Sequence, residues 1–257
     1  MFVLLILSEL AVSFSKEALR GKIALMHIIL FDIDGTLISS GGAGKSAIEA
    51  ALTETFDITP DSAGVPMAGR TDRSIVRDLF VQNGLENTEV NWTRVLESYL
   101  RVLPNYLQQC EGQVLPGVVA LLDVLRTREN CHLGLLTGNI EAGARLKLKY
   151  YGLLEFFCFG GFGDHCYDRN DVAREAWDAS QNLAGENAVN RKQVWVIGDT
   201  PADIHCGRSI GANVLAVATG WHSREILETE KPDLLFDDFS DPTRFLQLLS
   251  GVDFCEG

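Results

Sequence analysis

Helix-like and strand-like segments alternate along most of the C-terminal half of the chain, and this alternation restricts the fold more than any other feature. Apolar, strand-like runs occur at residues 133–136, 156–159, 194–197 and 214–217, with helical periodicity between them. Strands that alternate with helices form a parallel sheet with right-handed crossovers. We expect the short apolar run at residues 27–31 to join that sheet. The predicted fold class is therefore α/β, with a Rossmann-like parallel sheet as its core.

Two carboxylates, Asp32 and Asp34, come directly after the apolar run. Ligands of open α/β sheets gather beyond the carboxyl ends of the strands, so both acids are expected to face a cleft. Carboxylates this close repel each other unless a cation neutralises them or their protonation states differ, and magnesium is the economical explanation. An Asp-x-Asp-Gly segment also suits a calcium loop, but the twelfth position of that loop requires Glu and is Ala43 here.

A long helical segment follows the first predicted strand. Helical spacing of apolar residues extends from about residue 41 to residue 113, and a turn sequence at residues 115–117 ends the segment. We predict a helical cap at residues 41–113, inserted into a core made of residues 26–40 and 114–257. Such a cap would lie directly above the two carboxylates.

Residues 1–25 precede the first predicted strand. The apolar stretch at residues 1–14 has no basic residue before it, is interrupted by Glu9, and is shorter than the roughly 20 residues that a membrane-spanning helix needs. We therefore expect no membrane segment there. Met26 stands directly before the strand, and the sequence leaves open whether residues 1–25 are a dispensable extension or a wrongly assigned start.

The composition excludes several classes of function. A net charge of −13 over 257 residues gives no basic surface for nucleic acid or for an anionic membrane. The 6 cysteines lack the paired spacing of a zinc site or of a disulfide-rich scaffold, which indicates reduced thiols and a cytoplasmic location. We predict neither a nucleic-acid nor a membrane partner, and the oligomeric state cannot be derived from the sequence.

Polar residues also follow the strand-like run at 133–136. Thr137, Gly138 and Asn139 offer a hydroxyl and backbone donors that suit a phosphoryl oxygen. Thr-Gly-Asn is equally an ordinary turn, so the tripeptide alone does not decide between the two roles.

Asp199 and Asp203 follow the run at 194–197 and lie one helical turn apart at a predicted helix start. Both side chains can therefore face one ion. Both can also cap the helix, a role that Pro201 at an early helical position supports. The two roles are compatible.

A phosphoryl group beside so many carboxylates needs a fixed cation. Arg169 follows the strand predicted at 156–159 and is therefore placed at the cleft. Lys147 and Lys149 lie in the middle of a predicted helix, and we assign both to the solvated surface.

Together these segments resemble the haloacid dehalogenase superfamily, specifically its phosphatase branch with a helical cap inserted after the first motif. The family's first motif, Asp-x-Asp-Gly-Thr, is matched by residues 32–36, and its last, Gly-Asp-x-x-x-Asp, by residues 198–203. Dehalogenases carry tyrosine at the position of Asp34 and phosphonatases carry alanine, so the chain is similar to the phosphatases and phosphomutases. The third motif usually supplies lysine, and here Arg169 keeps the charge but changes its geometry.

The resemblance implies a Mg2+-dependent reaction. Asp32 would attack phosphorus, while Asp34 would protonate the leaving alcohol and then activate water. Magnesium would be held by Asp32, by Asp34 through its backbone carbonyl and by Asp199, with Asp203 in support. The phosphoryl group and the rest of the substrate would be bound by Thr137, Arg169, Gly35, Thr36, Gly138 and Asn139.

The substrate is predicted only as a small phosphorylated metabolite. Arg70 lies in the cap segment 67–73 and is our candidate contact for an anionic group, such as that of a carboxylated phosphoester; a plain surface arginine is the equal alternative. Resemblance to phosphoglycolate phosphatases favours the carboxylated class.

The sequence also suggests three alternatives to a phosphatase. A phosphomutase of the same fold shares the aspartyl-phosphate and differs mainly in excluding water, so the sequence does not separate the two. A nucleotide kinase is suggested by residues 39–46, which imitate a phosphate-binding loop, but that loop needs glycine where the chain has Ser39. A non-enzymatic phosphate-binding protein would not need the pair Asp32 and Asp34.

Overall fold

The computed structural model of the 257-residue chain describes residues 26–184 and 189–250. The prediction made for residues 1–25 lies outside these ranges. Within them, no helix combines the length and the apolar character that crossing a membrane requires.

Parallel strands form the central sheet in the order β5-β4-β1-β6-β7-β8. β1 lies between β4 and β6 and pairs with both in parallel register. This confirms the predicted α/β class with a parallel sheet. The strands are β1 (His27–Phe31), β4 (Cys131–Leu136), β5 (Gly160–Gly161), β6 (Val194–Gly198), β7 (Asn213–Val217) and β8 (Leu234–Phe236).

Helices cover both faces of the sheet, which is why β1 is apolar at successive positions rather than at alternate ones. Ile29 and Phe31 belong to one hydrophobic cluster with side chains of α5, α6 and α10. Ile28 and Leu30 point to the other face and join a cluster with α7 and α8. These helices are α5 (Val118–Arg126), α6 (Glu141–Tyr150), α7 (Arg169–Ala184), α8 (Pro201–Ser209) and α10 (Thr243–Leu249).

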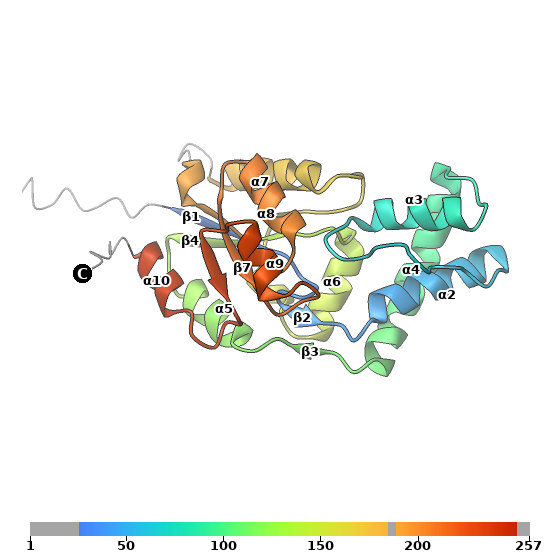
Figure 1. Cartoon of the computed structure of the whole chain (residues 1–257), viewed down its shortest axis with the longest axis horizontal. Coiled ribbons are helices and arrows are strands. Elements are labelled where there is room, and N and C mark those ends of the chain that lie inside the picture. Colours follow the sequence, from blue (N-terminus) through green and yellow to red (C-terminus); the bar gives the residue numbers. More distant parts are fainter. Residues whose placement is uncertain (1–25, 185–188, 251–257) are drawn as a thin grey trace, which may run out of the picture.

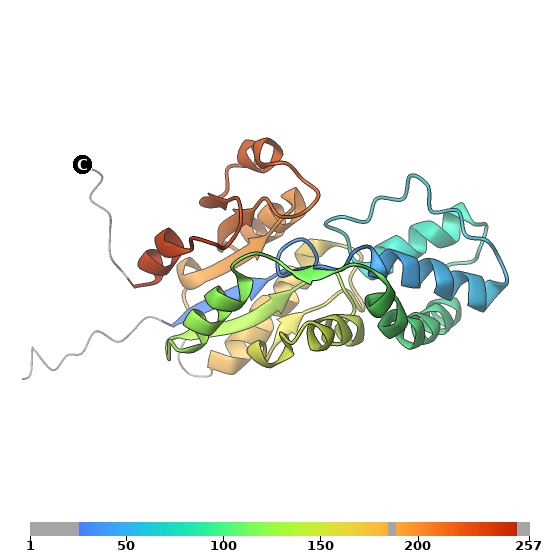
Figure 2. The same cartoon turned by 90° about the horizontal axis from the view of Figure 1, so that it is seen from below.

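Three further helices lie at the end of the molecule opposite α10 (Figure 1), and a quarter turn shows the same arrangement (Figure 2). Their apolar faces share a hydrophobic cluster of their own, joined by Ile140 at the start of α6. The division of the chain into a core and a cap at residues 41–113 stays a prediction. The helices are α2 (Ala43–Phe56), α3 (Asp72–Gln82) and α4 (Glu89–Gln109).

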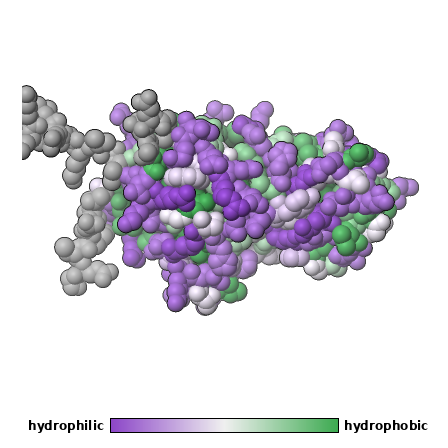
Figure 3. Space-filling model, turned by 90° about the horizontal axis from the view of Figure 1, so that it is seen from above, coloured by the Kyte–Doolittle hydropathy of each residue, from purple (hydrophilic) through white to green (hydrophobic). Residues whose placement is uncertain are grey.

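The chain leaves the sheet and returns to it through a two-stranded antiparallel ribbon, in which β2 (Ile38–Ser39) pairs with β3 (Gln113–Val114). Between β7 and β8 lies the short helix α9 (Arg224–Thr229). The face of the molecule in Figure 3 is largely hydrophilic, with hydrophobic residues in small separate patches.

The prediction of a strand at residues 156–159 is wrong. A 3-10 turn at Leu154–Phe156 precedes a shorter strand, β5, at Gly160–Gly161. A side chain at Gly161 would collide with the backbone of α7 at Val172, so the strand pairs where the helix can approach closely. The aromatic residues before it favour a strand by propensity alone, and tertiary packing overrides that preference.

Candidate active site

The site lies where the carboxyl ends of three adjacent strands meet. Asp32 follows β1, Thr137 follows β4 and Asp199 follows β6, and β1 is the middle strand of the three. Because parallel strands all end at the same edge of a sheet, residues more than 160 positions apart in sequence come into contact there: Thr36 Oγ1 donates to Asp199 Oδ1 over 3.2 Å, with a sequence separation of 163.

A cluster of buried carboxylates occupies one side of this edge. Oxygen atoms of Asp32, Asp199 and Asp203 all lie within 4.8 Å of one another. The Oδ2 atom of Asp199 is buried and has no hydrogen-bond partner among the described residues. Buried polar atoms are normally paired, so an unpaired carboxylate oxygen beside two other carboxylates fits a divalent cation with oxygen ligands.

The charges of the cluster are unbalanced. Burial raises the pKa of Asp32 to about 6, with the Arg169 guanidinium opposing and the Asp203 and Asp34 carboxylates adding to the rise. Burial and then the charges of Asp203 and Asp32 also raise the pKa of Asp199 well above its usual value. A bound cation would relieve both effects, because it stabilises the ionised form of each carboxylate.

Arg169, the first residue of α7, is buried between Asp32 and Asp203. Its Nη2 atom lies 3.2 Å from Asp32 Oδ1, is also bonded to Asp203 Oδ1, and donates to the Leu136 carbonyl over 3.3 Å. The Nε atom is buried without a hydrogen-bond partner among the described residues. The guanidinium thus contacts both carboxylates through one terminal nitrogen, as a lysine ammonium would, rather than through two parallel hydrogen bonds to one carboxylate.

The turn after β1 is shaped around Asp199. Gly35 has a φ of 87°, and a side chain there would collide with the Asp199 carboxylate. Thr219 Oγ1 donates to the Gly35 carbonyl over 2.6 Å, and the bond from the buried Thr36 reaches Asp199 from the same turn. Gly35 and Thr36 therefore orient a carboxylate of the cluster.

Asp34 points away from the carboxylate cluster. Its Oδ2 atom accepts from Lys147 Nζ over 2.6 Å and from Asn139 Nδ2 over 3.0 Å, and its Oδ1 atom accepts from Ser40 Oγ over 3.0 Å. Burial disfavours the ionised form, but the Lys147 ammonium and these hydrogen bonds outweigh it and lower the pKa of Asp34. The two acids of the motif thus have pKa values displaced in opposite directions.

The assignment of Lys147 to the solvated surface is wrong. Its side chain is only 5% exposed and forms an ion pair with Asp34, whereas Lys149 is exposed as predicted. The missed signal is the helical repeat of α6. Its buried residues recur at Gly143, Ala144, Lys147 and Leu148, so Lys147 lies four residues after Gly143 on the face that packs inward.

A family model described as haloacid dehalogenase-like hydrolase matches residues 29–217. The chain belongs to this family. Its curated relatives include the phosphoglycolate phosphatase of Synechococcus elongatus, 28% identical over 84% of this chain and 95% of that protein, and the phosphoglycolate phosphatase of Rhodospirillum rubrum, 29% identical over 82% and 87%. Together with the paired acids after β1, these matches confirm the assignment to the phosphatases of the family, which hydrolyse phosphoric monoesters.

Solved structures share the fold. A protein described as a predicted phosphoglycolate phosphatase from Haemophilus somnus has a TM-score of 0.65 and 22% identity, covering 88% of this chain and 100% of that one. A putative beta-phosphoglucomutase from Thermotoga maritima has a TM-score of 0.58 and 19% identity, covering 87% and 99%. The fold is therefore common to proteins described as phosphatases and as mutases.

The kinase interpretation of residues 39–46 is not favoured in this hydrolase. Lys45 lies in α2 with a side chain that is 51% exposed, and it pairs with Glu49 over 3.7 Å. Its ammonium is therefore solvated and paired within α2 rather than held in a phosphate-binding loop at the sheet edge.

The Thr-Gly-Asn segment of this haloacid dehalogenase-like hydrolase is more than a turn. The buried Thr137 Oγ1 accepts from the backbone N–H of Asn139 over 3.3 Å and from its side-chain amide over 2.9 Å. The same amide donates to Asp34, so the segment links the end of β4 to the second acid. Gly138 packs beneath the backbone of Arg70, where a side chain would collide.

The helical segment that contains α2, α3 and α4 contacts the carboxyl edge of the sheet at residues 70–72. The N–H of Asp72 donates to the Gly138 carbonyl over 2.7 Å, and the Asp72 carboxylate accepts from the N–H of Ile140 over 2.9 Å. The guanidinium of Arg70 pairs with Asp78 over 2.7 Å and bonds to carbonyls of its own segment. Its backbone thus lies at the site while its charge is already paired, and its contact with substrate stays a prediction.

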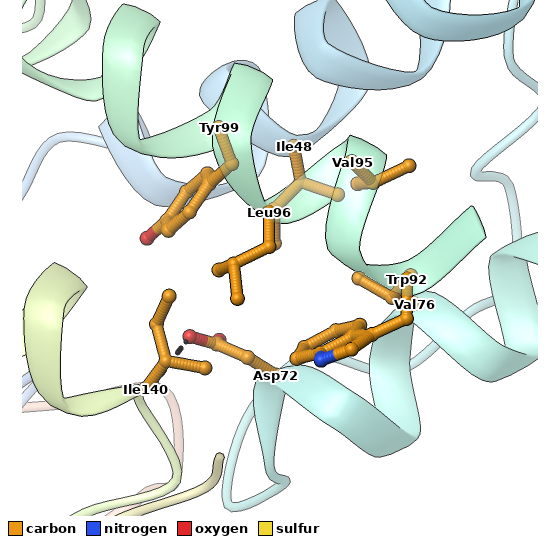
Figure 4. Close-up of a pocket in the computed structure, with 8 residues that line it drawn as sticks. All are labelled: Ile48, Asp72, Val76, Trp92, Val95, Leu96, Tyr99 and Ile140. Carbon is orange, nitrogen blue, oxygen red and sulfur yellow. Dashed lines mark hydrogen bonds between the residues drawn. The ribbon is translucent and has the colours of Figure 1, made fainter. Parts of the chain in front are cut away.

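A small cavity lies beside this contact, between α2, α3, α4 and the start of α6 (Figure 4). Asp72 and the Tyr99 hydroxyl both point toward Ile140, and the hydroxyl is buried without a hydrogen-bond partner among the described residues. Burial raises the pKa of Asp72 to about 6, although Lys147 opposes the rise. The lining is otherwise apolar and is made up of Ile48, Val76, Trp92, Val95 and Leu96.

Proposed function

We propose that this protein is a magnesium-dependent phosphatase that hydrolyses a small carboxylated phosphomonoester, of the phosphoglycolate type, through an aspartyl-phosphate on Asp32. The observation that carries the proposal is the unequal setting of Asp32 and Asp34. One acid lies in a carboxylate cluster with one cation, and the other is bonded at both oxygens to neutral or positive donors. Two adjacent carboxylates in such different surroundings suit two separate chemical roles.

In the first step, a carboxylate oxygen of Asp32 attacks phosphorus, and the bond from phosphorus to the leaving oxygen breaks. Arg169 holds the attacking carboxylate through the 3.2 Å contact and offers positive charge to the phosphoryl oxygens. Asp34 gives its proton to the departing alcohol oxygen, so this step draws on the minor, protonated form of an acid whose pKa is lowered.

In the second step, Asp34 accepts a proton from water, and the hydroxide oxygen attacks phosphorus. The bond between phosphorus and Asp32 breaks, which releases inorganic phosphate and restores both carboxyl groups. The lowered pKa of Asp34 favours the ionised form that this step needs. Thr137 and Gly138, at the end of β4, would bind phosphoryl oxygens, and Asn139 would keep the second acid in place.

The residues for magnesium would be Asp32, Asp199 and the backbone carbonyl of Asp34. Asp203 would act in support, because it is already engaged by Arg169 and by Thr200, whose hydroxyl donates to it over 2.7 Å. When bound, the ion supplies positive charge that offsets the carboxylate cluster and the charge of the phosphoryl group.

The substrate class rests on the relatives, which are described as phosphoglycolate phosphatases. Phosphate release should therefore be measured on a panel of small phosphomonoesters with and without magnesium, for the wild type and for Asp32→Asn. We expect magnesium-dependent release that the variant loses, with carboxylated esters turned over fastest. Release only after addition of a sugar bisphosphate would instead indicate a mutase, and no release from any ester would contradict the proposal.

A further inference from the structure

Lys147 is a buried cation with no role in the reaction as described so far. Its side chain is 5% exposed, in the middle of α6. Removing an ammonium group from water costs several kcal/mol unless an anion and further hydrogen bonds compensate for it. The contacts that hold Lys147 are therefore a guide to what it does.

Those contacts form a closed triangle around the second acid. Lys147 Nζ lies 2.6 Å from Asp34 Oδ2 and 2.6 Å from Asn139 Oδ1, while Asn139 Nδ2 donates to the same Asp34 oxygen over 3.0 Å. Each member bonds to the other two, so a rotation of the Asp34 carboxylate would break two bonds at once. Ser40 holds the remaining oxygen, Oδ1, over 3.0 Å. The Asp34 carboxylate is thus oriented at both oxygens.

The ammonium also lies against the cap. A side chain at Gly44, in α2, would come within 3.3 Å of Lys147 Nζ. Lys147 therefore sits where α2 of the cap approaches the sheet edge, beside Asp34, whose side chain is still 36% exposed. Asp34 keeps an accessible side for substrate, while Lys147 is enclosed behind it.

Neither of the other candidate cations can replace Lys147 in this position. Arg169 is engaged by Asp32 and Asp203, and Arg70 is paired with Asp78. Of the three, only Lys147 is bonded to Asp34.

We infer that Lys147 is a positioning residue, which aims the Asp34 carboxylate for proton transfer in both steps of the reaction and does not itself bind substrate. The inference deepens the proposed function and rests on it. It assigns to each acid of the motif its own cation, Arg169 for the nucleophile and Lys147 for the acid/base.

The test compares Lys147→Met with Lys149→Met on two substrates. Lys149 is an exposed lysine on the same helix, so it controls for the loss of a positive charge. One substrate is an alkyl phosphomonoester such as phosphoglycolate, whose leaving oxygen must be protonated. The other is p-nitrophenyl phosphate, whose leaving group departs as a stable anion, so that only the later attack of water needs Asp34.

We expect Lys147→Met to lower kcat on the alkyl ester by about 100-fold or more, the usual range for a lost proton-transfer group. On p-nitrophenyl phosphate it should release a rapid burst of nitrophenolate equivalent to the enzyme and then turn over slowly, because the aspartyl-phosphate forms but is not hydrolysed. Lys149→Met should match the wild type on both substrates. A merely structural role for Lys147 would reduce the burst along with the turnover.

Ser40→Ala is the second variant, because it frees the other Asp34 oxygen and leaves the buried ion pair intact. We expect the same pattern with a smaller loss of about 10-fold. This variant decides the matter if Lys147→Met does not fold.

Three outcomes would overturn the inference. The first is wild-type kinetics in both Lys147→Met and Ser40→Ala, and the second is loss of the nitrophenolate burst in a variant that is folded. The third is a rise in KM for the carboxylated ester alone, which would make Lys147 a substrate-binding residue. A wild type that hydrolyses no phosphomonoester would contradict the proposed function itself, a result separate from all three.

Discussion

The two acids of the motif lie two residues apart and have opposite electrostatic surroundings. Around Asp32 lie two further carboxylates and one cation, Arg169, and burial raises its pKa to about 6. Around Asp34 lie an ammonium, an amide and a hydroxyl, all donating to it, and its pKa is lowered. The carboxylates around Asp32 exceed the positive charge that Arg169 provides, so a bound cation would balance them. The negative charge of Asp34 is already balanced by Lys147.

The two cations reach the acids from opposite faces of the sheet. Arg169 begins α7, which packs on the face of Ile28 and Leu30, and Lys147 lies in α6, which packs on the face of Ile29. The central strand β1 ends between them. The end of β1 can therefore hold two carboxylates in different environments, because the helices on each face of the sheet provide the cation for one of them.

The largest expected effect distinguishes the two acids by activity. Asp32→Asn removes the nucleophile, and we expect kcat to fall by about 10⁴-fold or more with no phosphorylated enzyme. Asp34→Asn should lower kcat by about 10² to 10⁴-fold, yet still become phosphorylated by p-nitrophenyl phosphate. Quenching the reaction in acid and measuring the mass of the protein shows whether each variant becomes phosphorylated. Phosphorylation of the Asp32→Asn variant would show that the roles are assigned wrongly.

The second effect distinguishes the two sides by stability. Without metal, Asp199→Asn removes a repelling buried carboxylate and should raise the free energy of unfolding. Asp34→Asn leaves the Lys147 ammonium buried without its anion and should lower the free energy of unfolding by about 1–3 kcal/mol. This is less than for a fully buried ion pair, because the Asp34 side chain is 36% exposed.

Urea unfolding in the presence of a chelator measures these signs. Added magnesium should then stabilise the wild type and leave Asp199→Asn almost unchanged, because the variant has lost a predicted ligand. If both variants changed the free energy of unfolding in the same direction in the presence of the chelator, the proposed difference between the surroundings of Asp32 and Asp34 would be contradicted.

A third variant tests how Arg169 serves the Asp32 side. Both carboxylates are bonded to its Nη2 atom, so lysine can reproduce the contacts, and Arg169→Lys should keep kcat within about fivefold of the wild type. Arg169→Met should lose about 100-fold or more. If the lysine variant were as inactive as the methionine variant, the planar fork would be required after all.

The smallest effect concerns Asp72, at the contact between α3 and the start of α6. Its folded pKa of about 6 lies above the ordinary value of 3.8, so the folded state holds this proton more tightly and stability falls as the pH rises through 6. Asp72→Asn should therefore melt a few degrees higher than the wild type at pH 7.5, and the difference should shrink by pH 5. Melting curves at both pH values check this, and a constant difference would contradict it.

Four of the six strands of the central sheet, β1, β4, β6 and β7, were predictable from the sequence, although their exact extent was not. Runs such as 194–197 are apolar because helices cover both faces of a parallel sheet, and that signal is local. β5 was misplaced because its pairing depends on how closely α7 approaches Gly161. The short strand β8 was not predicted, since three residues at a sheet edge carry little periodicity.

What the sequence by itself determined is the parallel sheet and the residues at its carboxyl edge. Asp32, Asp199 and Thr137 end three strands, and the geometry of a parallel sheet brings strand ends together whatever the details of packing. Only the tertiary structure decided which cation meets which carboxylate. Lys147 and Lys149 are the same residue type in the same helix. The orientation of α6 on the sheet buries Lys147 beside Asp34 and leaves Lys149 exposed to water.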